Sequence, residues 1–151
     1  MGDFPFGNLV LNLSVLAWAI AQVLKFFVNL AVSGQRDWHY LLTGGGMPSS
    51  HSSTVCALAA SVAWLHGWGS TYFAITAILA VVVMYDACHV RQETGKQAQI
   101  LNYMMDNWAQ IKPEDLFGKD LKELIGHTPL QVLMGALLGV AVGLGGAALW
   151  G

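Results

Sequence analysis

The sequence predicts an all-α integral membrane protein, a bundle of about four transmembrane helices with short amphipathic helices on the cytoplasmic side. Of the 151 residues, 55% are hydrophobic and only 11% are charged, whereas a soluble domain usually carries about a quarter charged residues. The charges are also segregated, because residues 8–32 contain a single lysine and residues 52–85 and 128–151 contain none. The length suits one membrane-embedded domain covering residues 1–151.

Four spans are expected, at residues 8–32, 48–66, 71–89 and 128–150. A helix of about 20 residues crosses the roughly 30 Å hydrocarbon core. The short, uncharged turn at residues 66–71 predicts that the second and third spans form an antiparallel hairpin. The fourth span carries Gly135, Gly139 and Gly143 on one face, where a helix of the same chain or of a homodimer partner can approach closely.

The basic residues predict the orientation in the membrane. Four spans place both termini on one side and residues 33–51 and 86–127 on the other. Every lysine and arginine lies in these two segments or near the inner end of the first span, so the positive-inside rule makes that side cytoplasmic and the location the cell (inner) membrane. Two amphipathic helices, at residues 91–111 and 112–126, are expected to lie on the membrane surface or to cap the spans. Because Asp3 stands where a signal peptide has basic residues, no cleaved signal peptide is expected.

Several classes of function are disfavoured by composition. A net charge of −2 gives nucleic-acid binding no electrostatic support. Cys56 and Cys88 match no metal or disulfide spacing and are interpreted as packing residues. Asp86 alone is poor evidence for a metal, so neither a metal nor a cofactor is expected.

The stretch GGGMPSSHSS, residues 44–53, opens the second span. Ser49 and Ser50 can cap the free amides of a helix start, and Gly46, in the glycine-rich stretch before it, is a candidate phosphate-binding residue. Such an N-terminus binds anions readily, although an ordinary capped helix would look the same. His51 favours the functional interpretation, because it adds a titratable group to that N-terminus.

Cations near the span ends are candidate phosphate ligands. Lys25 either extends its ammonium to the headgroups or faces the bundle interior and binds an anion. Arg91 can hold phosphate oxygens bidentately, with Lys96 as a weaker companion, or it is a solvated charge at a helix end.

His127 opens the fourth span. Gln131, four residues later, can reach back to its imidazole, and Glu123, four residues earlier, is a second candidate for orienting it. The alternative is an interfacial histidine that caps a helix. Two histidines with cationic side chains on one side of a membrane are what phosphoryl transfer requires: a nucleophile, an acid and charge stabilisation.

These segments resemble a known group of proteins. "GGMPSSHS", "D…VR" and "GHTP…V…G…LG" are similar to the divergent branch of the type-2 phosphatidic acid phosphatase superfamily, over about Leu24 to Gly139. The resemblance implies a phosphatase that forms a phosphohistidine on His127, with His51 as the general acid. It also implies inhibition by vanadate, and it implies phosphate binding by the following residues: Lys25, Arg36, Ser49, Ser50 and Arg91.

The chain departs from the superfamily pattern at two positions of the candidate site. Ser50 stands where the motif has a glycine, and Gln131 stands where it has an aspartate. The expected function is hydrolysis of a lipid phosphate monoester, such as phosphatidylglycerol phosphate, phosphatidic acid or a polyprenyl phosphate. The alternative is a non-catalytic membrane protein that binds phosphorylated lipid headgroups or a partner protein. A transporter or channel has little support, because the polar residues gather at one face.

Overall fold

The computed structural model describes residues 6–33, 46–107 and 127–151, and all regular secondary structure within these ranges is helical. The elements are α1 (Leu9–Ser33), α2 (Ser50–His66), α3 (Thr71–Tyr85), the π-helical turn η2 (Asp86–Val90), α4 (Arg91–Asn107) and α5 (Pro129–Trp150). The all-α prediction is confirmed for this part of the chain. The predicted helix at residues 112–126 lies outside the described residues.

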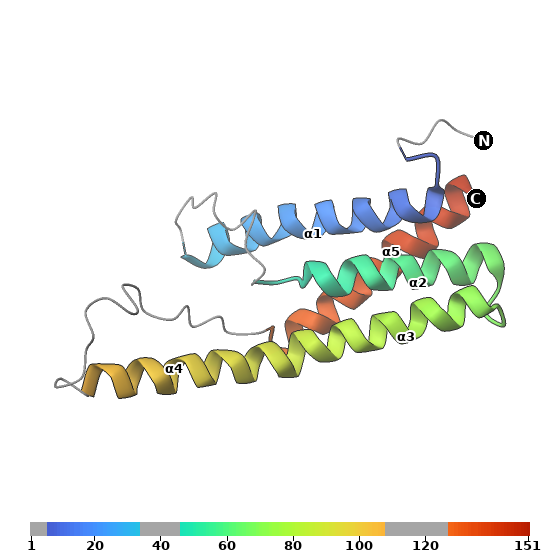
Figure 1. Ribbon diagram of the computed structural model, residues 1–151. Coiled ribbons are helices and arrows are strands. Elements are labelled where there is room, and N and C mark those ends of the chain that lie inside the picture. The colour runs from blue at the N-terminus through green and yellow to red at the C-terminus, as the bar shows by residue number, and fades with distance from the viewer. Residues whose placement is uncertain (1–5, 34–45, 108–126) are drawn as a thin grey trace.

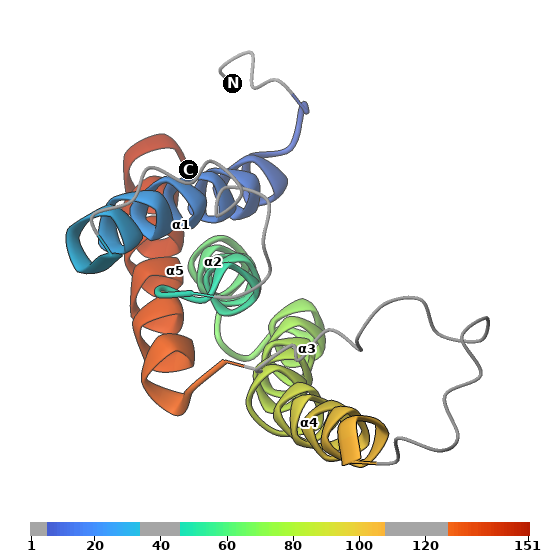
Figure 2. The same cartoon turned by 90° about the vertical axis from the view of Figure 1, so that its left-hand side faces the viewer.

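Helix α2 lies in the centre of the bundle. It contacts α1, α3 and α5, and the view along the bundle shows these three helices around it (Figure 2). Small residues make this arrangement possible, since α2 is rich in serine and alanine. Two of its buried hydroxyls donate to carbonyl oxygens: Ser53 Oγ donates to Ala17 O of α1 at 2.8 Å, and Ser61 Oγ donates to Ala57 O at 2.8 Å.

Three helical stretches of the described residues are long and apolar enough to cross a membrane: Leu9–Ala31, Thr71–Met104 and Pro129–Trp150. Helix α2, at the second predicted span, has 17 residues and is not among these three, so this span stays a prediction. At 1.5 Å per residue this helix is about 26 Å long, shorter than the roughly 30 Å hydrocarbon core. Because the other helices surround α2, it need not match the bilayer as a lipid-facing helix must.

The helix of the third predicted span continues beyond residue 89. Helix α3 continues through η2 into α4, and the three form one long rod that extends beyond the other helices (Figure 1). The prediction of a helix after residue 91 is confirmed, but this helix continues the line of α3 instead of lying across the ends of the spans. The junction between α3 and α4 contains no glycine or proline, and its five residues form the single π-helical turn η2.

The glycine row of α5 packs inside the chain. A Cβ at Gly135 would overlap the Ser49 carbonyl oxygen, and a Cβ at Gly139 would overlap the Ser53 carbonyl oxygen. At Gly143 a Cβ would lie 2.6 Å from Ala57 O. Because these three glycines have no side chain, α5 can approach α2 closely. Of the two expected arrangements, the structure shows packing within the chain, where α2 covers the face of Gly135, Gly139 and Gly143; a homodimer stays a prediction.

The helices alternate in direction, so α1, α2, α3 and α5 run up and down the bundle. The start of α1 and the end of α5 lie at one end of the molecule (Figure 1). The end of α1, the start of α2, the turn η2 and the start of α5 are therefore directed toward the opposite end. This second end carries the predicted site residues that the structure describes.

Candidate active site

The start of α2 is joined directly to the start of α5. Ser49 is the N-cap of α2, and its Oγ accepts a hydrogen bond from Ser52 N at 3.4 Å. The backbone N–H of Ser49 donates to Gln131 O at 2.9 Å. Ser49 is completely buried, and its hydroxyl also accepts a hydrogen bond from Ser52 Oγ at 3.1 Å. Ser49 is thus the helix cap that the sequence predicts, and its hydrogen bonds with Ser52 and Gln131 hold it in place.

Lys25 faces the interior of the bundle. Its side chain is 1% exposed, and its Nζ donates to Ser50 Oγ at 2.9 Å. The alternative in which Lys25 extends to the headgroups is therefore wrong in this structure. A buried ammonium beside a helix N-terminus favours the binding of an anion, because the ion and the helix dipole both contribute positive potential.

The direction of Lys25 follows from the residues one and two turns before it. Ala17 and Ala21 are fully buried, and they lie at four-residue spacing with Lys25 on one face of α1. Gly46 contacts the lysine from the other side: a Cβ there would lie 3.7 Å from Lys25 Cγ. Its φ of 97° is one that glycine adopts without strain.

The rings of His51 and His127 lie beside each other, with centroids 5.8 Å apart and planes inclined by 63°. We call these two residues the histidine pair. His51 is in the first turn of α2 and His127 immediately precedes α5, so the contact between α2 and α5 brings them together. His127 is 3% exposed, and its backbone N–H donates to Ala87 O of η2 at 3.1 Å.

Gln131 contacts the imidazole of His127, as the spacing predicts. Gln131 Oε1 lies 3.2 Å from His127 Nδ1, and it also accepts a hydrogen bond from Thr128 N at 3.1 Å. Thr128 Oγ1 accepts a hydrogen bond from Gln131 N at 3.4 Å, which completes a capping box at the start of α5. The polar side chain of Gln131 therefore serves the helix cap and the histidine together.

The other charged residues predicted for the site are Lys96, Arg91, Arg36 and Glu123. Lys96 is exposed, and its Nζ lies 2.6 Å from Glu93 Oε1 on the same helix, so the structure does not bring it to the histidine pair. Arg91 is the first residue of α4, next to η2, but its side chain is outside the description. Arg36 and Glu123 lie outside the described residues.

Two contributors were not predicted from the sequence. The carbonyl of Ala87 anchors His127 through its backbone, and nothing in the sequence around Asp86 to Val90 signals a π-helical turn. The second contributor is Thr128, the N-cap of α5. The pattern Thr-Pro-Leu-Gln at residues 128–131 does contain the signal for a capping box, a threonine three residues before a glutamine.

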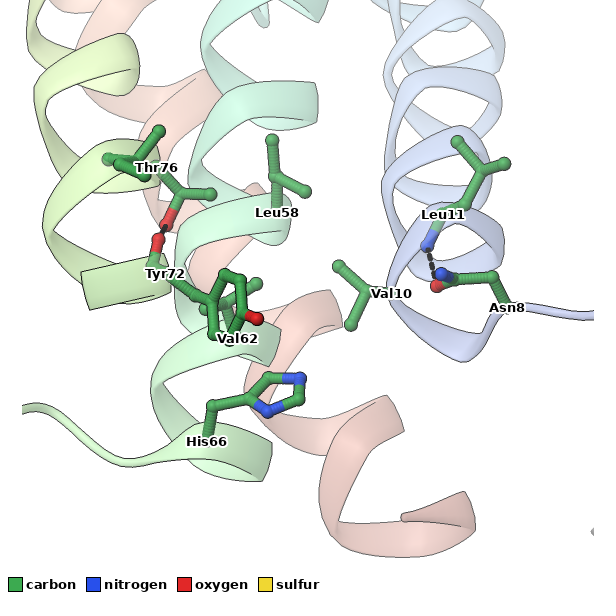
Figure 3. A pocket seen from close by; sticks show the side chains of 9 residues that line it. Asn8, Val10, Leu11, Leu58, Val62, His66, Tyr72 and Thr76 are labelled. Carbon is green, nitrogen blue, oxygen red and sulfur yellow. Dashed lines mark hydrogen bonds between the residues drawn. The ribbon is translucent and has the colours of Figure 1, made fainter. Parts of the chain in front are cut away.

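A groove of about 370 Å³ lies at the other end of the bundle (Figure 3). It is lined by the start of α1, the end of α2 and the start of α3, and its polar side chains are Asn8, His66, Tyr72 and Thr76. The groove contains neither member of the histidine pair, and the chemistry argued above does not involve it. Within the described residues, no group of three histidine, cysteine, aspartate or glutamate side chains is placed to hold a metal ion.

Known proteins share this chain's sequence over nearly its whole length. A model of the Divergent PAP2 family matches residues 6–142, which include both helix starts that carry the histidine pair. The chain is also 39% identical, over 142 residues, to the "Uncharacterized membrane protein YuiD" of Bacillus subtilis (strain 168), with 88% of this chain and 90% of that protein covered. No solved structure matches the chain. The resemblance inferred from the motifs is confirmed: the chain belongs to the Divergent PAP2 family, and it is a membrane protein.

Proposed function

We propose that the protein is a phosphatase that hydrolyses a lipid phosphate monoester through a phosphohistidine intermediate. The observation that carries the proposal is the histidine pair, with ring centroids 5.8 Å apart beside the start of α2. A phosphoryl group in contact with one imidazole lies within reach of the other. Two adjacent imidazoles can supply the nucleophile and the general acid of a phosphoryl transfer.

The reaction has two steps. In the first, the lone pair of His127 attacks phosphorus, the bond from phosphorus to the lipid oxygen breaks, and His51 gives its proton to that oxygen. The products are the lipid alcohol and phosphohistidine. In the second, His51 takes a proton from water, whose oxygen attacks phosphorus. The bond from nitrogen to phosphorus breaks, which releases inorganic phosphate and returns both histidines to their starting forms.

The buried ammonium of Lys25 supports this role. Together with the N-terminal amides of α2, it would stabilise the negative charge on the equatorial oxygens of the transition state. Because Lys25 is fixed by Ser50 Oγ at 2.9 Å, its charge is already in place before the substrate arrives. Ser50, which stands where the superfamily motif has a glycine, supplies the hydroxyl that orients the lysine.

A lipid substrate follows from the position of the site in a membrane protein. His127 lies just before the start of α5, a helix that can span a bilayer, and His51 lies beside it. The end of a spanning helix is the depth at which lipid phosphates are found. The excess of basic residues supports a site at the cytoplasmic leaflet, with both termini on the opposite side. Phosphatidylglycerol phosphate, phosphatidic acid and polyprenyl phosphates all have the required monoester.

A second function is favoured by one observation. Gln131 is a neutral amide where an aspartate would offset the charge of a protonated or phosphorylated His127. This difference supports a protein that binds phosphorylated lipid headgroups, or a partner protein, without turnover. Such a protein would use the same cation and helix N-terminus but would not need His127 as a nucleophile.

Phosphate release by the purified protein from a panel of lipid phosphates tests the proposal, with His51→Ala and His127→Ala as controls. The phosphatase predicts release from at least one lipid and loss of that release in His127→Ala. No release above the His127→Ala background with any lipid would contradict it. Saturable binding of the same lipids without release would favour the binding protein.

A further inference from the structure

The side-chain amide of Gln131 can be oriented without ambiguity. Its outer atoms, an oxygen and a nitrogen, are usually hard to tell apart, and hydrogen-bond partners must decide. The atom assigned as Oε1 lies 3.1 Å from the backbone nitrogen of Thr128. A backbone N–H can only donate, so the atom facing it must be the oxygen.

The same oxygen then determines the state of the histidine. Gln131 Oε1 lies 3.2 Å from His127 Nδ1. An amide oxygen can only accept, so this contact is favourable when Nδ1 carries a hydrogen. A neutral imidazole has one ring hydrogen, and its lone pair must then be on Nε2.

We infer that the capping box of α5 positions His127, with Thr128 and Gln131 holding the imidazole in the tautomer that carries hydrogen on Nδ1 and its lone pair on Nε2. The catalytic meaning of this inference rests on the proposed function, since Nε2 would be the nucleophilic atom. Thr128 and Gln131 are positioning residues, because they act on the substrate only through His127.

The backbone on both sides of this unit is fixed. His127 N donates to Ala87 O at 3.1 Å, and Gln131 O accepts from Ser49 N at 2.9 Å. The unit that orients the histidine is therefore attached to η2 at one end and to the cap of α2 at the other. Its geometry follows from how the helices pack, as a preorganised site requires.

The neutrality of Gln131 separates two effects that an acidic residue combines. A carboxylate near an imidazole selects the tautomer and also favours the protonated, positively charged ring. The amide accepts the same hydrogen bond without adding a negative charge beside the ring. Gln131→Glu would keep both hydrogen bonds while adding the charge.

Nitrogen NMR of the full-length protein in nanodiscs tests this inference without any turnover. The protein is labelled with ¹⁵N-histidine, the His127 signals are identified by their loss in His127→Asn, and spectra are recorded at alkaline pH, where imidazoles are neutral. The wild type is expected to carry its hydrogen on Nδ1. In Gln131→Met, the ratio of this tautomer to the other is expected to fall about fivefold to tenfold, as for the loss of one hydrogen bond.

Two further variants complete the test. Thr128→Ser keeps the cap and is expected to keep the wild-type tautomer. Gln131→Glu is expected to keep it as well and to raise the imidazolium fraction as the pH is lowered. A wild-type His127 with hydrogen on Nε2, or an unchanged ratio in Gln131→Met, would overturn the inference. Because the spectra report the ring directly, the inference can hold even if no lipid is hydrolysed, and it can fail in an active enzyme.

Discussion

The imidazoles of His51 and His127 meet at the contact between α2 and α5, with centroids 5.8 Å apart. Their proximity depends on the bare backbone of Gly135, which lets the start of α5 lie against the Ser49 carbonyl oxygen. The helix contact and the candidate site are therefore the same feature of the fold. Changes at either one are expected to affect the other.

Replacing His51 is expected to slow the first step, the transfer of phosphate from the lipid to His127, by about 10²–10⁴-fold, the usual contribution of a general acid. The loss in this step, followed as the initial burst of released alcohol, should be much smaller for an aryl phosphate, because its leaving group departs as a stable anion and needs no proton. His51→Asn is measured against the wild type with both substrates. Equal losses on the two substrates would contradict the role of His51 as the acid.

Replacing Lys25 by methionine keeps most of the side-chain volume and removes the charge. Loss of a preorganised group that stabilises developing negative charge typically lowers turnover by about 10²–10³-fold. Lys96→Met is the matched control, because Lys96 is exposed and bonded to Glu93. Activity should fall in the first variant and stay at the wild-type level in the second. A loss in Lys96→Met would show that the exposed surface of α4 takes part in the reaction.

Vanadate is expected to inhibit the enzyme in competition with the lipid phosphate, since it can adopt the five-coordinate geometry of the transition state on His127. Inhibition constants measured at several substrate concentrations test this directly. Binding of vanadate should be lost in His127→Ala, whereas weak binding of inorganic phosphate should persist through Lys25. Tight vanadate binding to His127→Ala would place the reacting phosphorus elsewhere.

The contact between α2 and α5 predicts opposite effects at two glycines. A methyl group at Gly139 would overlap the Ser53 carbonyl oxygen, so Gly139→Ala is expected to destabilise the fold by about 1–3 kcal/mol. Nothing lies within 4 Å of the Cβ position of Gly145, so Gly145→Ala should stabilise α5 by roughly 0.5–1 kcal/mol. Unfolding titrations in detergent compare the two. Equal stability of both variants would contradict this packing.

The orientation in the membrane can be tested with single cysteines in a background where Cys56 and Cys88 are replaced. Trp68→Cys lies in the exposed turn between α2 and α3, and Lys96→Cys lies on the exposed surface of α4. In intact cells, a maleimide that cannot cross the membrane is expected to label the first position only. Labelling of Lys96→Cys before permeabilisation would reverse the proposed topology.

Much of the fold could be predicted because its signals are local. Charge depletion located α1, α3 and α5, and the serines of residues 49–53 located the start of α2. The length of α2 could not be predicted in the same way, because a surrounded helix is limited by its neighbours and not by bilayer thickness. The turn η2 has no local signal, since no glycine or proline marks it.

In the candidate site too, some contacts could be predicted from the sequence and others could not. The contact of Gln131 with His127 follows from their four-residue spacing, so the sequence was sufficient to predict it. The burial of Lys25 was left open, although Ala17 and Ala21 on the same face of α1 indicate close helix packing there. The pairing of His51 with His127 depends on how α2 and α5 cross, which only the three-dimensional packing determines.

The most direct test of the central claim is to trap the phosphorylated enzyme. The wild type is mixed with a ³²P-labelled lipid phosphate, stopped with alkali to preserve phosphohistidine, and digested so that the labelled peptide can be identified. The label is expected on His127, to be lost on acid treatment, and to be absent from His127→Ala. Release of phosphate by the wild type with no label on His127, or release by His127→Ala at the wild-type rate, would contradict the mechanism.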